Sequence, residues 1–299
     1  MKVASWVGLA GSLLVIWTGD LSAVDVARVQ PMKLAAMEAL YNGECGQDLV
    51  GVGVLKPDIK PGMKEDPMLF SVDIPYGLSV LANHDMNSFV PGINDLIAGV
   101  AISPDGDTIN TVSYARRIEI GKAAQEALRA YGEARAAGNE EQMKLAAAAL
   151  QDSYRYFGYG FLQSPEDAVP PVALTFYAFR IMVMAGGYLL LLFIVLVFLS
   201  YRSVKTLERG WLHWAGMLSI PVVWICSEAG WIVAEVGRQP WTIQDVLPRN
   251  VAISDVPVSS VQTTFWIFAA IFTLLLIAEV SIMLRYIAQQ SKLNIEQTK

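Results

Sequence analysis

Three long apolar runs constrain this chain more than any other feature of its sequence. They cover Val172–Ser200, Trp211–Val236 and Val261–Arg285, and each exceeds the roughly 20 residues that an α-helix needs to cross a hydrocarbon core. The composition agrees, because 54% of the 299 residues are hydrophobic and only 17% are charged. An ordinary soluble domain is less apolar. The sequence therefore predicts an all-α integral membrane protein.

A fourth, shorter apolar run over residues 1–19 allows two interpretations. Lys2, the apolar stretch after it and the small residues near Ala23 are typical of a secretory signal peptide. The same run would also serve as a first transmembrane helix. In that case the chain forms a four-span helical bundle, with a long extracytoplasmic loop between spans one and two.

The placement of lysine and arginine predicts the orientation in the membrane. The short connection over residues 201–209 carries three positive charges, and residues 285–299 carry three more. Cytoplasmic loops are enriched in such charges, so both termini are expected in the cytoplasm. The predicted segments are a first span over 1–19, an extracytoplasmic loop over 20–171, spans over 172–200, 211–236 and 261–285, an extracytoplasmic connection over 237–260 and a cytoplasmic tail over 286–299.

Charge and cysteine content exclude several classes of function. The net charge is −6, and much of the acid lies in the long outer loop, so nothing indicates a nucleic-acid partner. Cys45 and Cys226 lie at different predicted depths and do not suggest a disulfide, and the sequence has no CxxC or zinc-ligand spacing.

The outer loop has recognisable parts. Pro31 suits the first position of a short helix. Residues 43–75 are rich in Gly, Pro, Asp and Lys and are expected to be irregular. Residues 115–162 are rich in strong helix formers, with an interruption at Gly138-Asn139, and predict two amphipathic helices.

The third apolar run carries two acidic residues. Glu228, Trp231 and Glu235 follow one another at helical spacing and share a face, which Trp224 extends by one turn. Ionisable residues inside a span are costly and indicate function. This face could line a flat aromatic cofactor and supply a carboxylate ligand to its metal. Alternatively, Glu235 could pair with Arg238 at the membrane boundary, which the residues alone favour.

The second apolar run contains Phe179-Arg180-Ile181-Met182. A methionine in an apolar helix usually fills the core. Arg180 must find an anion. It points to a different side of the helix from Met182, so a cofactor carboxylate or a neighbouring helix is the expected contact. Gly186, one turn after Met182, would let a flat ring approach closely.

A third group lies at the start of the outer loop, in Gln30-Pro31-Met32-Lys33-Leu34-Ala35-Ala36-Met37-Glu38-Ala39-Leu40. Lys33 and Glu38 are about 140° apart on a regular helix, so both cannot flank one ring unless the helix is distorted. Taken alone, the segment is typical of an amphipathic surface helix with solvated charges.

Together these three segments resemble one family. Gly230-Trp231-Ile232-Val233-Ala234-Glu235-Val236-Gly237-Arg238-Gln239-Pro240-Trp241 closely resembles the signature of subunit I of cytochrome bd quinol oxidases, and the two segments described before it are similar to further parts of that subunit. The resemblance runs unbroken from about Trp17 and favours a span over residues 1–19. It implies an enzyme that oxidises membrane quinol and reduces oxygen to water.

The resemblance also implies residue roles. Glu235 would be an axial ligand of a high-spin b-type haem, with Trp231 packed beside it, Arg238 near the propionates and Glu228 on the same face. Met182 would be an axial ligand of a low-spin b-type haem, with Arg180 beside it. A third haem would be a d-type or a further b-type. Lys33 and Glu38 would act in quinol binding and oxidation.

The family's two histidine ligands are not matched. His84 lies in the outer loop and His213 near the cytoplasmic end of the third span, and neither aligns with a ligand position. The resemblance covers the latter part of subunit I, namely its quinol loop and last four helices. The expected partners are a separate N-terminal half of subunit I, subunit II and small single-span subunits.

The predicted function is therefore that of a quinol:oxygen oxidoreductase component in a bacterial or archaeal cytoplasmic membrane, inactive by itself. A haem-poor paralogue acting as a scaffold or assembly subunit is the alternative. A quinone-binding sensor is a third interpretation.

Overall fold

The computed structural model describes residues 2–102, 108–202 and 210–297. Lys205, Arg209 and Lys299, on which the predicted orientation partly depends, lie outside these ranges. The chain divides into two compact units, Met1–Ala252 and Ile253–Lys299, and each is described by itself.

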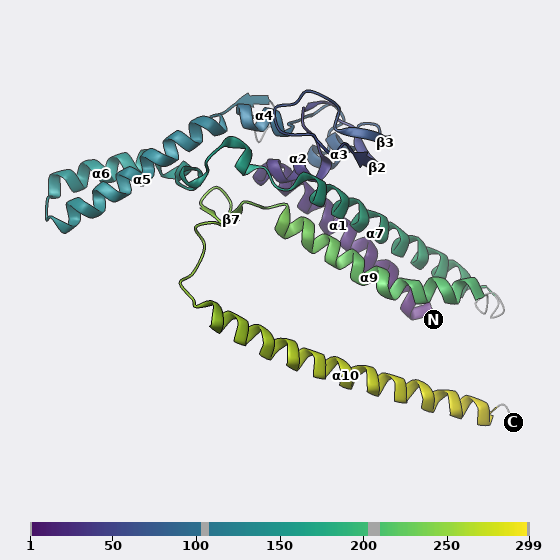
Figure 1. The fold of residues 1–299 in the computed structure, drawn as a ribbon. Coiled ribbons are helices and arrows are strands. Elements are labelled where there is room, and N and C mark those ends of the chain that lie inside the picture. Colours follow the sequence, from purple (N-terminus) through teal and green to yellow (C-terminus); the bar gives the residue numbers. More distant parts are fainter. Residues whose placement is uncertain (1, 103–107, 203–209, 298–299) are drawn as a thin grey trace. The chain divides into compact units, whose positions relative to one another are not determined.

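Four helices are long and apolar enough to cross a membrane. They are α1 (Lys2–Val29), α7 (Val172–Ser200), α9 (Gly210–Val236) and α10 (Val258–Gln297). In the first unit, α7 packs against both α1 and α9 (Figure 1). The second unit consists mainly of α10. The prediction of a helical membrane protein with four spans is confirmed.

The first helix is longer than its apolar run. It continues past residue 19 to Val29, and two of the polar residues in this extension have hydrogen-bond partners. Ser22 donates to the carbonyl of Thr18, and Asp20 is 3.1 Å from the ring of His84. The last turns also bury Ala27 against the outer loop, so tertiary packing extends the helix beyond the predicted span.

The outer loop begins with a short helix, α2 (Pro31–Glu38), which starts with proline at its first position as predicted. It ends at Ala39, whose backbone is left-handed with φ of 52°. Six of its eight residues are buried. It is therefore a packed element and not the solvated surface helix that its sequence alone suggests.

The expectation that residues 43–75 are irregular is wrong. Strands β2 (Leu49–Leu55) and β3 (Met68–Ile74) form an antiparallel hairpin. Its first strand alternates valine with glycine, and valine favours extended backbone. The end of β2 contacts α7, where Leu55 N–H donates to the Tyr177 hydroxyl at 3.0 Å. This contact adds to the preference of the valines for extended backbone.

Further short elements complete the outer loop and the connection after α9. The helices are α3 (Gly77–Asn83) and α4 (Ile93–Ala98), and the paired strands are β1 (Glu44–Cys45) with β4 (Phe89–Val90), β5 (Val100–Ile102) with β6 (Thr108–Asn110), and β7 (Trp241–Ile243) with β8 (Leu247–Pro248).

The two helices predicted within residues 115–162 are present as α5 (Tyr114–Ala136) and α6 (Glu140–Ser153), which lie side by side (Figure 1). Gly138 turns the chain between them with φ of +68°, a conformation that glycine adopts without strain. Asn139 then caps α6 by accepting from the Gln142 N–H at 3.1 Å. The 3-10 helices η1 (Tyr154–Phe161) and η2 (Pro165–Ala168) lead back to α7.

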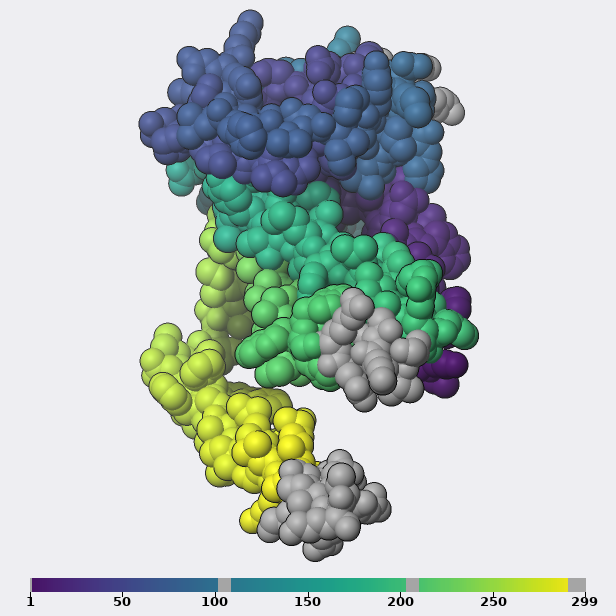
Figure 2. Space-filling view, turned by 90° about the vertical axis from the view of Figure 1, so that its right-hand side faces the viewer, coloured from purple at the N-terminus to yellow at the C-terminus, as the bar shows by residue number. Residues whose placement is uncertain are grey.

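Buried apolar residues form two clusters in the first unit. One joins the outer loop to the connection after α9, around Ile93, Tyr159 and Trp241. The other lies where α1, α2, α3, α7 and α9 meet, and includes Met37 and Ala178. Figure 2 shows the outer-loop segments, in blue, gathered as a layer over one end of the green α7 and α9. The candidate site lies where these helices meet the outer loop.

Candidate functional site

Helix α2 lies where α7 and α9 approach the outer loop, and its two charged side chains reach different helices. Glu38 contacts Arg180 of α7, whereas Lys33 contacts the end of α9. Lys33 and Glu38 therefore point to different sides of α2, as expected for a regular helix. The helix is not distorted in a way that would bring both side chains to one point. The α2 helix joins the two helices that carry the candidate ligands.

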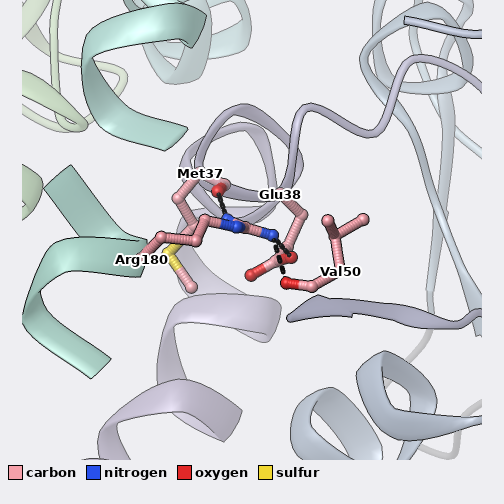
Figure 3. A network of polar contacts seen from close by, with 4 residues as sticks. All are labelled: Met37, Glu38, Val50 and Arg180. Carbon is pink, nitrogen blue, oxygen red and sulfur yellow. Dashed lines mark hydrogen bonds and ion pairs between the residues drawn. The ribbon is translucent and has the colours of Figure 1, made fainter. Parts of the chain in front are cut away.

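Glu38 and Arg180 form a buried ion pair (Figure 3). Arg180 Nη2 is 2.5 Å from Glu38 Oε2 and also donates to the Val50 carbonyl at 2.9 Å. Its Nη1 donates to the Met37 carbonyl, and the guanidinium lies 3.8 Å from the centre of the Phe176 ring. Only 3% of Glu38 and 4% of Arg180 are exposed. Of the two contacts expected for Arg180, the structure shows the one from a neighbouring helix.

Burial dominates the electrostatics of this pair. It raises the pKa of Glu38 to about 7, although Arg180 opposes the shift through its charge and its hydrogen bond. A carboxyl with a pKa near 7 exchanges its proton near neutral pH, as a general base must. Glu38 Oε1 is also buried and has no hydrogen-bond partner among the described residues. Arg180 thus holds one carboxylate oxygen of Glu38, and the other keeps its lone pairs.

Lys33 caps the C-terminal end of α9. Its Nζ donates at 3.3 Å to the carbonyl of Ala234, one of the last carbonyls of the helix that lack an intrahelical partner. A positive charge there also complements the helix dipole. Burial and the nearby Arg238 lower the pKa of Lys33, while Glu235 opposes them. Lys33 therefore belongs to the same charged group as Glu235 and Arg238.

The expected ion pair between Glu235 and Arg238 is formed at the end of α9. Arg238 Nη2 is 2.5 Å from Glu235 Oε2, and both side chains are partly exposed. No hydrogen bond reaches Glu235 Oε1 from the residues that the structure describes. The pair is compatible with a metal-ligand role, because that second oxygen keeps its lone pairs.

The face of α9 that carries Trp224, Glu228 and Trp231 lies open. The two tryptophans are 69% and 62% exposed, and Glu228 is exposed with no hydrogen bond or ion pair to any described residue. Within this chain, α9 packs through other residues, among them Ala229 and Val233. A carboxylate on an open membrane-spanning face is costly, so this face fits a cofactor or a further helix.

Met182 lies half-buried between α7 and α9. A Cβ atom built on Gly230 would be 3.2 Å from its sulfur, and the Cys226 thiol donates to its carbonyl at 3.4 Å. One turn further along α7, the space around Gly186 is open. The thioether beside this open glycine and the carboxylate of Glu235 are each chemically suited to bind a haem.

The two histidines stay outside these groups. His84 ends α3 with a left-handed backbone and pairs with Asp20. His213 lies near the start of α9. In the part of the chain that the structure describes, no three His, Cys, Asp or Glu side chains gather as a metal site. A haem held by single axial ligands does not require such a cluster.

Sequence reasoning missed a network that joins the outer loop to the segment after Arg238. The buried Tyr159 hydroxyl donates to Asp245 at 2.7 Å and accepts from Arg117 at 3.0 Å. The Tyr159 ring lies 4.9 Å from Trp241, measured between centres. The aromatic run over residues 154–161 is the only sequence signal of this network, and it does not reveal the partners.

We expect Lys33→Met to loosen the C-terminal end of α9 and to lower the stability by about 1 kcal/mol, since one hydrogen bond and one favourable helix-end charge are lost. Thermal unfolding of the purified complex measures the change. Lys60→Met is the control, because Lys60 is exposed in the outer loop. Equal stabilities of the two variants would contradict the capping role.

Comparison with known proteins gives one consistent result. The model of the family "cytochrome bd terminal oxidase subunit I" matches residues 1–291. Cytochrome bd-II ubiquinol oxidase subunit 1 from Escherichia coli (strain K12) is 33% identical over 296 residues, which cover 92% of this chain and 52% of that protein. Cytochrome bd ubiquinol oxidase subunit 1 from Bacillus subtilis (strain 168) is 25% identical over 254 residues, which cover 85% of this chain and 40% of that protein.

Among solved structures, bd oxidase from Geobacillus thermodenitrificans matches with a TM-score of 0.55 and 24% sequence identity, over 93% of this chain and 46% of that one. This match concerns the fold. The chain spans about half the length of the curated relatives that it matches.

Proposed function

The chain belongs to the cytochrome bd terminal oxidase subunit I family, and from this we propose that it is a haem-binding, quinol-oxidising component of a terminal oxidase. The arrangement of α2 carries the proposal. One ionisable residue of this helix binds α7 two residues before Met182, and the other binds α9 next to Glu235. The proposed site of quinol oxidation is therefore anchored to both of the helices that carry the candidate haem ligands.

Met182 would hold a low-spin b-type haem and Glu235 a high-spin b-type haem. A bound haem supplies one-electron transfer, and a thioether ligand raises its potential. Trp231, with its exposed ring, packs against a flat cofactor, and Arg238 supplies positive charge for propionates. Glu228 lies on the same face of α9 as Trp231, and its carboxylate needs either a proton or a positively charged partner.

In quinol oxidation, Glu38 is the proposed base. Its pKa of about 7 suits proton uptake from a quinol hydroxyl, and Arg180 holds the carboxylate in place. Lys33 supports the reaction from the end of α9, where it binds the carbonyl of Ala234 next to Glu235. This division of roles follows from the different helices that the two side chains contact.

This chain spans about half the length of the curated relatives that it matches, so the proposed enzyme has further parts. We propose that an N-terminal half of subunit I provides the histidine ligands, and that subunit II and small single-span subunits complete the complex. The third haem, of d-type or b-type, would reduce oxygen. The complex would lie in a bacterial or archaeal cytoplasmic membrane, with both termini of this chain in the cytoplasm.

The test is to purify the complex through a tag on this chain and to record its reduced-minus-oxidised spectrum and its oxygen consumption with quinol. We expect b-type haem bands and quinol-dependent oxygen uptake. A complex that contains this chain but shows no haem would identify a scaffold or assembly subunit. Quinone binding with haem-free, oxygen-independent behaviour would identify a sensor.

A further inference from the structure

We propose that the polar cleft between the end of α2 and the β2–β3 hairpin is the route by which protons from quinol leave Glu38 for the outer surface. The proposal rests on the proposed function, in which Glu38 accepts those protons. The cleft has a volume of about 400 Å³. Its lining includes Glu38, Gln47, Asp48, Asp66, Ser71 and Asp73.

Glu38 connects the cleft to the buried ion pair with Arg180. Glu38 is one of the residues that line the cleft, although only 3% of it is exposed. The other acidic residues of the lining are exposed. The cleft therefore begins at one buried carboxyl, which α7 holds through Arg180, and ends among carboxylates that face water.

Two oxygen atoms in the lining residues indicate water. Glu38 Oε1 and Gln47 Oε1 are buried, and neither has a hydrogen-bond partner among the described residues. Buried polar atoms are nearly always satisfied by protein or by ordered water. A polar space with room for several molecules and with polar walls holds such water. Water between these two oxygens would give the proton its first acceptor.

The charges around Glu38 give the cleft a direction. Arg180 from α7 binds Oε2 and stabilises the ionised carboxyl. Further out, the cleft carries five carboxylates and a single lysine, which together attract cations. These charged residues are Glu44 and Asp48 after α2, Lys64, Glu65 and Asp66 in the hairpin loop, and Asp73 on β3. A proton released from Glu38 thus moves toward negative charge.

An O–H bond of quinol breaks and its proton binds the Glu38 carboxylate; a bound b-type haem would supply the oxidant that accepts one electron for each proton. Glu38 then gives the proton to water in the cleft and returns to the ionised form beside Arg180. Repetition for the second hydroxyl yields quinone, two protons and two electrons.

The test uses the assembled oxidase with Gln47→Leu, which removes a buried acceptor at similar side-chain size. We expect quinol-dependent oxygen uptake to fall by roughly tenfold, a part of what general acid–base catalysis contributes, and the solvent isotope effect to rise. A small base such as imidazole added to the medium should restore part of the rate, because it accepts the proton in place of the cleft. Haem content and reduction by dithionite should stay unchanged.

Two further variants separate the possible results. Asp85→Asn, a loop carboxylate that is not part of the cleft lining and accepts one local hydrogen bond, should keep the rate. Asp73→Asn changes a cleft carboxylate that has one local hydrogen bond. It should lower the rate and raise the isotope effect, and it replaces Gln47→Leu if that variant does not assemble.

If these cleft variants turn over at the normal rate while Glu38→Gln is slow, the cleft proposal is wrong and the proposed function stands. If Glu38→Gln itself is unaffected, Glu38 is not the base and the proposed quinol chemistry fails.

Discussion

Replacing Met182 with alanine is expected to remove the low-spin b-type haem band from the spectrum of the assembled oxidase. The thioether would be the only ligand that this chain gives to that haem, and alanine offers no lone pair to iron. Electron transfer from quinol should stop with it. Reduced-minus-oxidised spectra and haem extraction measure the loss.

The matched control is Met184→Ala on the same helix, where the side chain is 52% exposed. It removes an equal thioether and should leave every band in place. Glu235→Ala should instead remove the high-spin band and spare the low-spin one. Arg238→Met breaks the ion pair with Glu235 but keeps the Glu235 carboxylate. It therefore distinguishes the loss of a haem ligand from the loss of the ion pair. Unchanged spectra in both ligand variants would refute the electron-transfer role.

Replacing Arg180 with methionine is expected to destabilise the protein by about 3–5 kcal/mol, the range for breaking a buried ion pair from one side. Glu38 would then lose its buried counter-charge and keep one buried carboxyl without compensation. Thermal or chemical unfolding of the complex measures the effect. Arg202→Met is the control, because Arg202 is exposed at the other end of α7.

The loss in Arg180→Met should depend on pH. Burial raises the pKa of Glu38 from 4.5 to about 7 in the folded protein, so its ionisation lowers the stability as pH rises through that interval. Without Arg180 the carboxyl is even harder to ionise, and the variant should be damaged more at pH 8 than at pH 6. The double variant with Glu38→Gln should recover most of the stability. A loss that is equal at both pH values would contradict this account.

Hydropathy predicts the membrane helices well because the lipid environment demands long apolar segments. Helix α7 spans the whole of its apolar run. The α5–α6 hairpin was also predictable, since strong helix formers flank a glycine and a capping asparagine. In these regions the conformation that the local sequence favours is the one that the structure shows.

The β2–β3 hairpin and the Glu38–Arg180 pair could not be predicted in this way. The glycines of β2 hide its alternating pattern, and contact with α7 supplies part of its stability. Glu38 and Arg180 are 142 residues apart, and no local rule selects one carboxylate among the many in the outer loop. The sequence indicates that Arg180 needs an anion, but only the tertiary fold identifies it.

The short α2 helix has a consequence for how the length of this loop can change. Inserting or deleting one residue between Lys33 and Glu38 would rotate one charge by about 100° relative to the other, and one of the two anchors would be lost. The turn at Gly138 between α5 and α6 carries no such constraint, because no atom lies within 4 Å of a Cβ built there. Length variation among homologous chains should therefore occur at that turn and be absent from the six residues that link α7 to α9.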